Sequence, residues 1–327
     1  MAKKLKVLLT RMLPAKGMDL LHRFFDLDVN REDKIMPREV LKERIRNKDG
    51  LVCLLTDNID AAIIARALRL KIISNYAVGY NNIDLVEALK RKIPVTNTPD
   101  VLTETTADLT FGLLISIARR IVEADHFLRA GEFKGWAPEL LLGADVHGKV
   151  LGIIGMGRIG RAVARRALGF NMKIRYADTR RLPIGVEQEH NAQYCTLKEL
   201  LKEADYVSVH VPLNEQTRQL LSVGEFRLMK KTAYLINVAR GEIVDEGALV
   251  AAIRDKEIAG CALDVYENEP RVEAGLISLP NVVLVPHIGS ASTEARTEMS
   301  MMVANNVISV LIDRKHPPNI VNPEIYE

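Results

Sequence analysis

The stretch VLGIIGMGRIGRAVARRAL, from Val150 to Leu168, decides the fold class of this chain. It begins with an apolar run that is typical of a buried strand. It then passes through a glycine-rich segment into a helical pattern, in which Ile159, Val163 and Ala167 recur at helical spacing. A strand, a glycine-rich turn and a helix in this order predict the opening unit of a parallel α/β sheet that binds a nucleotide.

The glycines of this stretch, Gly155, Gly157 and Gly160, have the spacing G-x-G-x-x-G. The first permits a tight turn, the second leaves room for a pyrophosphate, and the third allows the helix to pack closely on the strand. Arg158 and Ile159 then present backbone amides at a helix N-terminus, where an anion is favoured. Other nucleotide binders, such as S-adenosylmethionine enzymes, also use glycine-rich turns, so the glycines alone do not assign hydride transfer.

The next strand indicates which dinucleotide binds. KIRYAD ends at Asp178, about 20 residues beyond the glycines, where an acid bonds the hydroxyls of the adenine ribose. This acid favours NAD, because a 2′-phosphate would meet a negative charge. Arg180 and Arg181 follow, and guanidinium groups bind phosphate well, so NADP is possible as well.

Outward from this stretch, short strands rich in Val, Ile and Leu alternate with helical patterns, which predicts parallel strands joined by crossover helices. Before Pro99 the predicted strands are KVLLT from Lys6, LVCLLT from Leu51, KIISNYA from Lys71 and IPVTN from Ile93. After Lys149 they are VLGII, KIRYAD, YVSVHV, AYLINV, CALDV and VVLVP, the strand count of a complete doubly wound sheet. Two α/β domains with doubly wound parallel sheets are therefore expected.

Helical patterns set the predicted domain boundaries. One long helix is expected from Thr103, with Gly131 at its end, between the two series of strands. A last helix, from Thr293 to about Ile312, follows the sixth strand of the second series, and we expect it to return to the first domain; packing on the second domain is the alternative. The predicted domains are residues 1–99 with 287–327, and residues 100–286.

Composition excludes several classes of protein. The 327 residues are 48% hydrophobic with a net charge of only +3, which fits a folded protein and disfavours a nucleic-acid binder. No apolar run reaches the roughly 18 residues of a membrane span, and the N-terminus lacks a signal-peptide core, so a cytoplasmic location is expected. Cys53, Cys195 and Cys261 are scattered, which argues against a disulfide framework and against a metal site.

Polar residues at three predicted strand ends carry the chemistry, because ligands of open α/β sheets bind outside those ends. Arg240 follows the strand that ends at Val238, and its planar guanidinium could clamp a carboxylate and polarise a neighbouring carbonyl. His287 follows another strand and could exchange a proton near neutral pH, which carbonyl reduction requires. Glu269 could accept a hydrogen bond from this imidazole. Taken singly, each has a structural alternative: a surface ion pair, a structural histidine and an acidic turn.

At this point the chain resembles the D-isomer-specific 2-hydroxyacid dehydrogenase family, and most closely its glyoxylate and hydroxypyruvate reductase branch. The resemblance covers nearly the whole chain in several blocks that occur in the right order. The blocks are YAVGYNNID from Tyr76, NTPDVLTETTAD from Asn97, GEFKGW from Gly131, GIIGMGRIG, HVPL from His210, INVARG from Ile236, LDVYENEP from Leu263 and PHIGSA from Pro286.

The resemblance implies a Rossmann coenzyme domain and a flavodoxin-like substrate domain. It also implies that Arg240 binds the carboxylate and ketone oxygen of a small 2-keto acid, that His287 donates the proton and that Glu269 supports it. Val78 and Gly79 would offer backbone amides to the substrate carboxylate. The implied coenzyme contacts are Thr106 or its neighbour Thr105, Gly155, Gly157, Arg158, Ile159, Gly160, Asp178, His210, Pro212, Val238, Ala239, Asp264, His287 and Gly289, with Asp264 near the nicotinamide carboxamide.

Relatives in this family are homodimers, so the resemblance implies a homodimer formed through residues 103–136. Trp136, the only tryptophan, matches a residue that reaches the partner's substrate pocket in the glyoxylate reductase branch, where it limits substrate size. Packing within the interface is the alternative role. No nucleic-acid or membrane partner is expected.

Three alternative functions share this pattern. Phosphoglycerate dehydrogenase is one, although many of those enzymes carry a regulatory extension and this chain ends at Glu327. Phosphite dehydrogenase is another, but those enzymes typically place a lysine where this chain has Val78. A dinucleotide-sensing corepressor is the third, and the absence of appended disordered tails disfavours it.

Overall fold

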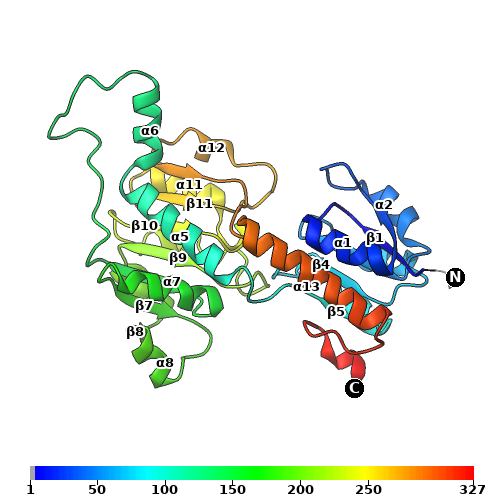
Figure 1. Ribbon diagram of the computed structural model, residues 1–327. Helices are drawn as coiled ribbons and strands as arrows, with labels where there is room; N and C mark the ends of the chain where they lie inside the picture. Colours follow the sequence, from blue (N-terminus) through cyan, green and yellow to red (C-terminus); the bar gives the residue numbers. More distant parts are fainter. Residues whose placement is uncertain (1–3) are drawn as a thin grey trace. The chain divides into compact units, whose positions relative to one another are not determined.

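The computed structural model describes residues 4–327. The chain forms two units, the first comprising the residues up to Leu102 together with Ala291–Glu327, and the second comprising Thr103–Ser290. Each unit has one sheet whose neighbouring strands pair in parallel, with helices on its faces (Figure 1). The predicted fold class, two doubly wound parallel-sheet α/β domains, is thereby confirmed.

The first unit has the strand order β2-β1-β3-β4-β5, which is the flavodoxin-like order. Its strands are β1 (Lys6–Leu9), β2 (Asp26–Val29), β3 (Gly50–Leu54), β4 (Ile73–Tyr76) and β5 (Val95–Thr96). Sequence analysis did not predict β2, an edge strand with the sequence DLDV in which no residue is buried. A strand without a continuous apolar run gives little sequence signal.

The helices of the first unit include one from the far end of the chain. They are α1 (Ala15–Phe24), α2 (Arg38–Ile45), α3 (Ala61–Arg66), α4 (Leu85–Lys90), α13 (Thr293–Leu311) and the 3₁₀ helix η2 (Pro323–Tyr326). Helix α13 lies beside α1 and packs on β3 and β4 (Figure 1). Its Val303 and Val307 share a buried cluster with Val7 and Leu9 of β1. Helix α13, far along the chain, thus completes the core of the first unit.

The second unit has the strand order β12-β11-β10-β9-β6-β7-β8. Its strands are β6 (Val150–Ile154), β7 (Lys173–Ala177), β8 (Ala192–Tyr194), β9 (Tyr206–Val209), β10 (Tyr234–Asn237), β11 (Gly260–Leu263) and β12 (Val282–Leu284). The order reverses at β6, between β7 and β9, which is the switch point where a dinucleotide binds in this type of sheet. The short edge strand β8 is additional to the six strands that were predicted.

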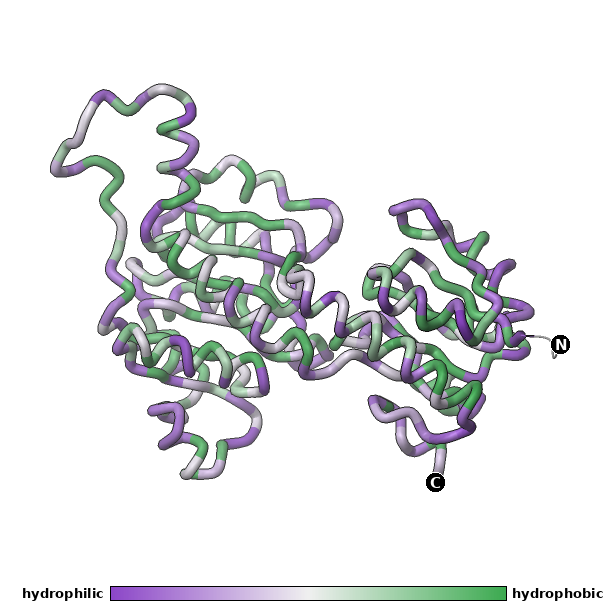
Figure 2. The backbone as a smooth tube through the Cα atoms, in the orientation of Figure 1, coloured by the Kyte–Doolittle hydropathy of each residue, from purple (hydrophilic) through white to green (hydrophobic). Residues whose placement is uncertain are grey.

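The remaining elements of the second unit are helices. They are α5 (Thr103–Ala118), α6 (Ile121–Arg129), α7 (Arg158–Leu168), α8 (Ile184–Glu189), α9 (Leu197–Glu203), α10 (Val223–Phe226), the 3₁₀ helix η1 (Gly241–Ile243), α11 (Glu246–Arg254) and α12 (Ala274–Ile277). Two buried clusters, one on each side of the strands, form the core. Figure 2 shows the corresponding hydrophobic colour along the strands and the inner helix faces.

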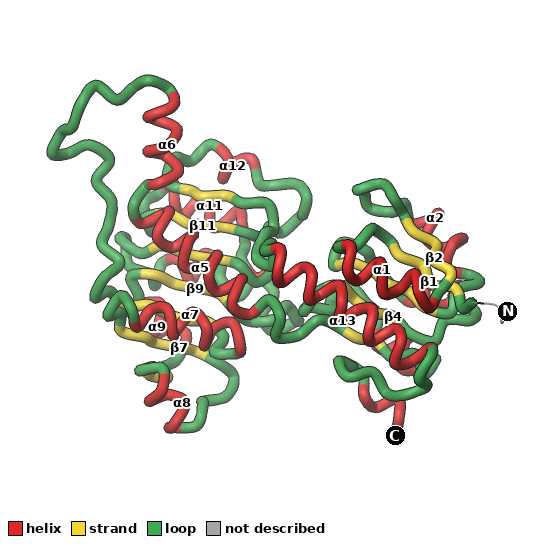
Figure 3. The backbone as a smooth tube through the Cα atoms, in the orientation of Figure 1, coloured by secondary structure: helices red, strands yellow, loops and turns green. Residues whose placement is uncertain are grey.

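The single long helix predicted from Thr103 is wrong, because the chain breaks into α5 and α6 at Arg119 and Arg120. Arg120 adopts a left-handed conformation, and the amide of Ala144 donates to the carbonyl oxygen of Ala118 at 2.7 Å. This bond occupies the Ala118 carbonyl oxygen, which in a continuing helix would accept a hydrogen bond from the amide four residues later. After α6 the chain runs through a long loop to β6 (Figure 3).

Three further features concern the described part of the chain, residues 4–327. None of its helices combines the length and the hydropathy that crossing a bilayer demands. A cluster of three or more His, Cys, Asp or Glu residues suited to a metal ion is not found there either. The three cysteines are free thiols, and Cys53 and Cys261 are buried.

Candidate active site

The glycine-rich turn between β6 and α7 has the conformation that the sequence motif predicts. Gly155 has a φ of +94°, and a Cβ atom on it would lie 2.8 Å from the carbonyl carbon of His210. A Cβ on Gly160 would lie 2.2 Å from the carbonyl oxygen of Gly155, so only glycine allows α7 to start this close to the strand. A Cβ on Gly157 would meet no atom within 4 Å. The backbone is therefore open at the position where a pyrophosphate approaches.

Asp178 lies next to this turn, directly after β7. Its Oδ2 accepts a hydrogen bond from the amide of Met156 at 2.8 Å, which fixes the carboxylate beside the glycine loop. The N-terminus of α7, at Arg158, carries no side-chain cap. Open backbone, uncapped amides and a fixed acid together fit a dinucleotide whose pyrophosphate meets the helix and whose ribose meets the acid.

His210 and Pro212 follow β9, the neighbour of β6 in the sheet. The amide of His210 donates to the carbonyl oxygen of Ile154 at 2.7 Å, and its Nε2 lies 2.7 Å from Oγ of Ser208. Burial lowers the pKa of His210 to about 3, so this imidazole is neutral at physiological pH. A neutral ring cannot serve as the proton donor of a reaction near neutral pH.

Arg240 sits in a turn that follows β10 and that Asn237 holds in place. The side chain of Asn237 donates to the carbonyl oxygen of Arg240 at 2.9 Å and accepts from the amide of Ala239 at 3.0 Å. Burial lowers the pKa of the Arg240 guanidinium, while the charges of Glu269 and Glu242 raise it. A desolvated guanidinium interacts more strongly with an anion than one in bulk water does. Val238, the first residue after β10, is buried.

His287 and Glu269 form an ion pair on two neighbouring loops. Nδ1 of His287 lies 2.9 Å from Oε2 and 3.1 Å from Oε1 of Glu269, whose Oε1 also accepts from the amide of Tyr266 at 3.1 Å. Burial raises the pKa of Glu269. This effect is outweighed by the hydrogen bond and charge of His287, by the Tyr266 amide and by the charge of Arg240, so the pKa of Glu269 lies below its usual value. Because Glu269 occupies Nδ1, proton exchange with a ligand falls to Nε2.

Asp264, directly after β11, holds the loop that carries His287. Its two carboxylate oxygens accept from the amides of Ile288 at 2.6 Å and Gly289 at 2.8 Å, and its carbonyl oxygen accepts from the His287 amide at 2.9 Å. Burial raises the pKa of Asp264, although these amides and the His287 charge lower it. His287 has a φ of +52°, which is rare for residues other than glycine. The bonds to Asp264 stabilise this strained conformation.

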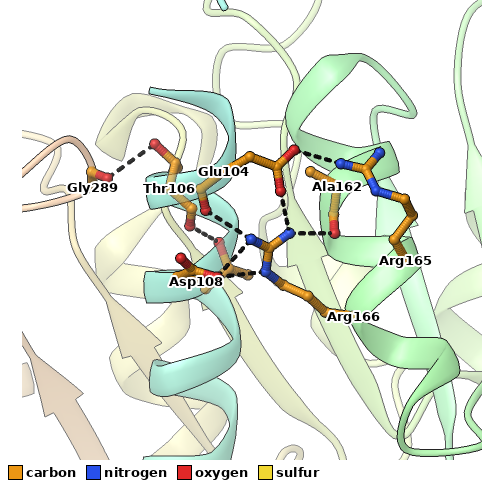
Figure 4. Close-up of polar contacts among 8 residues, drawn as sticks. Glu104, Thr106, Asp108, Ala162, Arg165, Arg166 and Gly289 are labelled. Atoms are coloured by element: carbon orange, nitrogen blue, oxygen red, sulfur yellow. Dashed lines mark hydrogen bonds and ion pairs between the residues drawn. The ribbon is translucent and has the colours of Figure 1, made fainter. Parts of the chain in front are cut away.

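Helix α5 connects this loop with the glycine-turn helix (Figure 4). Oγ1 of Thr106 donates to the carbonyl oxygen of Gly289 at 3.0 Å. Glu104 and Asp108, which lie two residues before and two residues after Thr106, form ion pairs with Arg166 of α7 at 2.8 and 2.6 Å. One helix therefore contacts both the His287 loop and the helix that follows the glycine turn.

The Arg240 turn also packs directly on the loop that carries Glu269. A Cβ on Gly241 would lie 1.8 Å from the carbonyl carbon of Tyr266. The amide of Glu267 in the same loop donates to the buried Glu246 at 2.9 Å. Sequence analysis assigned no role to Asn237, Glu246 or this close approach. The one sequence signal for this contact was the position of Gly241 directly after Arg240.

This contact leads to a first prediction. Gly241→Ala should displace the Arg240 turn or the Glu269 loop by about 1 Å, a misplacement that lowers kcat/KM about 100-fold. Gly247→Ala, in α11, is the matched control, because its Cβ would meet only Oδ1 of Asp245 at 3.5 Å. Steady-state kinetics of both variants check the prediction, and kcat/KM of Gly241→Ala within about twofold of the parent contradicts it.

The remaining candidates lie in other parts of the chain. Val78 and Gly79 belong to the first unit, in the turn after β4, where Asn97 donates to the Val78 carbonyl oxygen and Asn75 to that of Gly79, each at 2.8 Å. Trp136 lies in the loop after α6 and is 84% exposed. The structure thus brings Arg240, Glu269 and His287 together within the second unit, and places Val78 and Gly79 in the first.

A switch-point glycine turn, a half-buried arginine and a histidine–carboxylate pair in one unit are the features of an NAD(P)-dependent oxidoreductase. The family model of the D-isomer specific 2-hydroxyacid dehydrogenase, NAD binding domain, matches residues 111–289. The chain is also 49% identical over 326 residues to a glyoxylate reductase of Thermococcus litoralis, covering 98% of each chain. The chain therefore belongs to the D-isomer-specific 2-hydroxyacid dehydrogenase family, as the sequence analysis predicted.

Solved structures agree with this assignment. The TT0316 protein from Thermus thermophilus is 44% identical with a TM-score of 0.91, over 97% of this chain and 100% of that one. A glyoxylate/hydroxypyruvate reductase from Sinorhizobium meliloti, described as NADPH-dependent and solved with NADP and malonate, is 32% identical. Its TM-score is 0.86, over 98% of this chain and 97% of that one. The predicted coenzyme, NAD with NADP possible, agrees with these findings.

Proposed function

We propose that this chain reduces glyoxylate and hydroxypyruvate to 2-hydroxy acids with NADH, using Arg240, Glu269 and His287 as catalytic residues. One observation carries the proposal: Nδ1 of His287 is 2.9 Å from Glu269, and the charge of the desolvated Arg240 reaches the same carboxylate. The 49% identity to an enzyme named glyoxylate reductase supports the choice of substrate.

The reduction needs an anion site, a proton donor and a dry environment. Arg240 clamps the substrate carboxylate and polarises the ketone oxygen with the parallel donors of its guanidinium. A nicotinamide coenzyme held by the second unit would supply the hydride for the carbonyl carbon. His287 transfers its Nε2 proton to the carbonyl oxygen, and Glu269 stabilises the imidazolium before that transfer. In the oxidative direction His287 accepts the proton from the hydroxyl group.

The two units have different proposed roles. The second unit binds the coenzyme through the glycine turn, Asp178 and the segments at His210 and Pro212, with Asp264, Thr106 and Gly289 at the nicotinamide end. The first unit offers the amides of Val78 and Gly79 to a carboxylate. The Val78 and Gly79 amides share their peptide groups with the carbonyls of Ala77 and Val78. The Ala77 carbonyl oxygen accepts from the Thr98 amide at 2.9 Å, and the Val78 carbonyl oxygen accepts from the Asn97 side chain. Because the carbonyl and the amide of a trans peptide point in opposite directions, these bonds orient the two amides away from the segment of Asn97 and Thr98.

A second prediction follows from the Val78 turn. Asn97→Ala removes the bond to the Val78 carbonyl oxygen and should raise KM for the keto acid about tenfold, while the dissociation constant of NADH stays unchanged. Asn30→Ala is the matched control, since its side-chain amide also donates to backbone carbonyls of the first unit, those of Thr10 and Lys34. Steady-state kinetics and NADH titration measure the two quantities. An unchanged KM in Asn97→Ala counts against this role.

We further propose that the chain forms a homodimer through residues 103–136, with Trp136 limiting substrate size. Helix α6 has no buried residue, and the segment from 121 to 142 exposes Leu128, Phe133, Trp136 and Leu142. Several large exposed apolar side chains within one segment indicate an interaction surface. The third prediction is that sedimentation velocity gives the mass of two chains and that Phe133→Glu with Leu128→Glu gives that of one. A monomeric parent protein at micromolar concentration would refute it.

A kinetic panel tests the proposed activity. Oxidation of NADH is measured with glyoxylate, hydroxypyruvate, pyruvate and phosphohydroxypyruvate, and reduction of NAD with phosphite. Glyoxylate or hydroxypyruvate should give the highest kcat/KM. A preference for phosphohydroxypyruvate or phosphite would identify one of the rival dehydrogenases, and dinucleotide binding without any turnover would favour a sensing protein. A cytoplasmic location and the absence of nucleic-acid partners stay predictions.

A further inference from the structure

The two arginines after Asp178 differ in what their side chains contact. An arginine near this strand end is the usual means of accommodating the 2′-phosphate of NADP. The sequence places Arg180 and Arg181 there without distinguishing them. In the structure both side chains are exposed, but Arg181 is held by a carboxylate of its own segment, that of Glu187.

The bond between Arg181 and Glu187 is bidentate. Nε and Nη2 of Arg181 donate to Oε1 and Oε2 of Glu187, each at 2.9 Å. Only 5% of the Glu187 side chain is exposed, whereas 61% of the Arg181 side chain is. These two parallel charge-assisted bonds occupy the Nε–Nη2 edge of the guanidinium, a fork that also suits phosphate, and leave only the Nη1 side open. Arg181 is therefore fixed at Glu187 and cannot turn this fork towards a phosphate without giving up both bonds.

Tyr176 of β7 keeps Glu187 in place. Its hydroxyl donates to Oε1 of Glu187 at 2.7 Å and accepts from the amide of Leu182 at 2.8 Å. The bonds from Arg181 and then Tyr176 lower the pKa of Glu187 to about 2, so the carboxylate stays ionised at physiological pH. Without Arg181, the buried carboxylate of Glu187 would keep the Tyr176 hydroxyl as its donor and lose its charged partner, which is energetically unfavourable. The pairing is thus stable against competition by an incoming phosphate.

We propose that Glu187 is a specificity-determining residue: it withholds Arg181 from the 2′-phosphate subsite and so favours NAD over NADP. Arg180 is then the guanidinium through which NADP binds, opposed by the charge of Asp178. This inference rests on the coenzyme site at Asp178 that the proposed function uses. It does not depend on which keto acid is reduced.

Calorimetric titration with NADH and NADPH tests the inference, because the ratio of their dissociation constants cancels any effect common to both. Glu187→Gln removes the charge that holds Arg181 and should shift the ratio about tenfold towards NADPH, which corresponds to one charge-assisted bond gained. Arg181→Ala alone should leave the ratio unchanged. Adding Arg181→Ala to Glu187→Gln should abolish the shift. Arg180→Ala should lower the affinity for NADPH selectively.

Arg180 and Arg181 are exposed, so their variants keep the test decisive even if Glu187→Gln fails to fold. A selective loss of NADPH affinity in Arg181→Ala would overturn the inference, and so would an unchanged ratio in folded Glu187→Gln. If neither dinucleotide binds the parent protein, this inference and the proposed function fall together. If both bind in the predicted ratios but glyoxylate is not reduced, only the proposed substrate is wrong.

Discussion

His287→Asn is expected to lower kcat for keto-acid reduction about 10²- to 10⁴-fold, the usual contribution of a positioned general acid. The dissociation constant of NADH should stay unchanged, because the glycine turn and Asp178 are untouched. Asparagine is the appropriate replacement, since it tolerates the left-handed conformation that residue 287 adopts and cannot donate a proton as an acid. Stopped-flow measurement of NADH oxidation, together with NADH titration, checks both quantities.

The pH dependence separates this role from a structural one. In the parent enzyme, kcat/KM for reduction should fall as pH rises, because reduction consumes the proton that His287 is proposed to donate, and kcat/KM for oxidation should rise. The lowered pKa of Glu269 keeps its carboxylate ionised across neutral pH, and the ion pair is lost only as pH falls through that value. The fall in kcat/KM for reduction at alkaline pH therefore does not come from Glu269. His22→Asn, on the exposed face of α1, is the control, and a flat profile would exclude His287 as the acid.

Arg240→Lys is expected to reduce kcat/KM at least about 100-fold, with KM for the keto acid raised and NADH binding retained. A single ammonium group cannot reproduce the planar fork that binds a carboxylate and a ketone oxygen together. Each charge-assisted bond lost costs about 1.5–3 kcal/mol, and more in a desolvated position such as this one. The charge of Arg240 also lowers the pKa of Glu269, and lysine keeps a positive charge at this position, so the loss should fall on keto-acid binding rather than on the His287 pair.

Arg254→Lys provides the matched control for this substitution, because Arg254 is an exposed arginine in the last turn of α11. It should leave both kinetic constants unchanged. In Arg240→Ala, added guanidinium ion should restore part of the activity, which a merely misfolded variant would not show. Kinetic constants of Arg240→Lys equal to those of the parent would mean that another residue binds the carboxylate.

The central part of the fold was predictable because its signals are local. The apolar strands and the spacing of Gly155, Gly157 and Gly160 depend on neighbouring residues, and the structure has the two parallel sheets that they indicate. The edge strands β2 and β8 lack an apolar run. The break after α5 depends on the bond from Ala144 to Ala118, which joins residues far apart in the chain. Helical periodicity cannot reveal such a bond.

In the candidate site, too, local sequence features were predictable and contacts between distant residues were not. Strand ends and residue chemistry marked Arg240, Glu269 and His287 as candidates, the family resemblance gave them their roles, and the structure brings His287 and Glu269 into contact. The contacts that hold them were not predicted, since Asp264 was expected only as a coenzyme contact and Asn237 had no assigned role. Asp264 fixes the His287 loop through backbone amides, and Asn237 orients the Arg240 turn. These contacts depend on how loops from different strands meet, and no pattern along the chain specifies that.

A crystal structure with NADH and oxamate, which resembles a small 2-keto acid but is not reduced, tests the catalytic assignment most directly. We expect the oxamate carboxylate on the guanidinium of Arg240, and its carbonyl oxygen about 2.6–3.2 Å from Nε2 of His287. Oxamate bound away from both side chains, or Arg240 and His287 pointing into separate regions in that complex, would contradict the account.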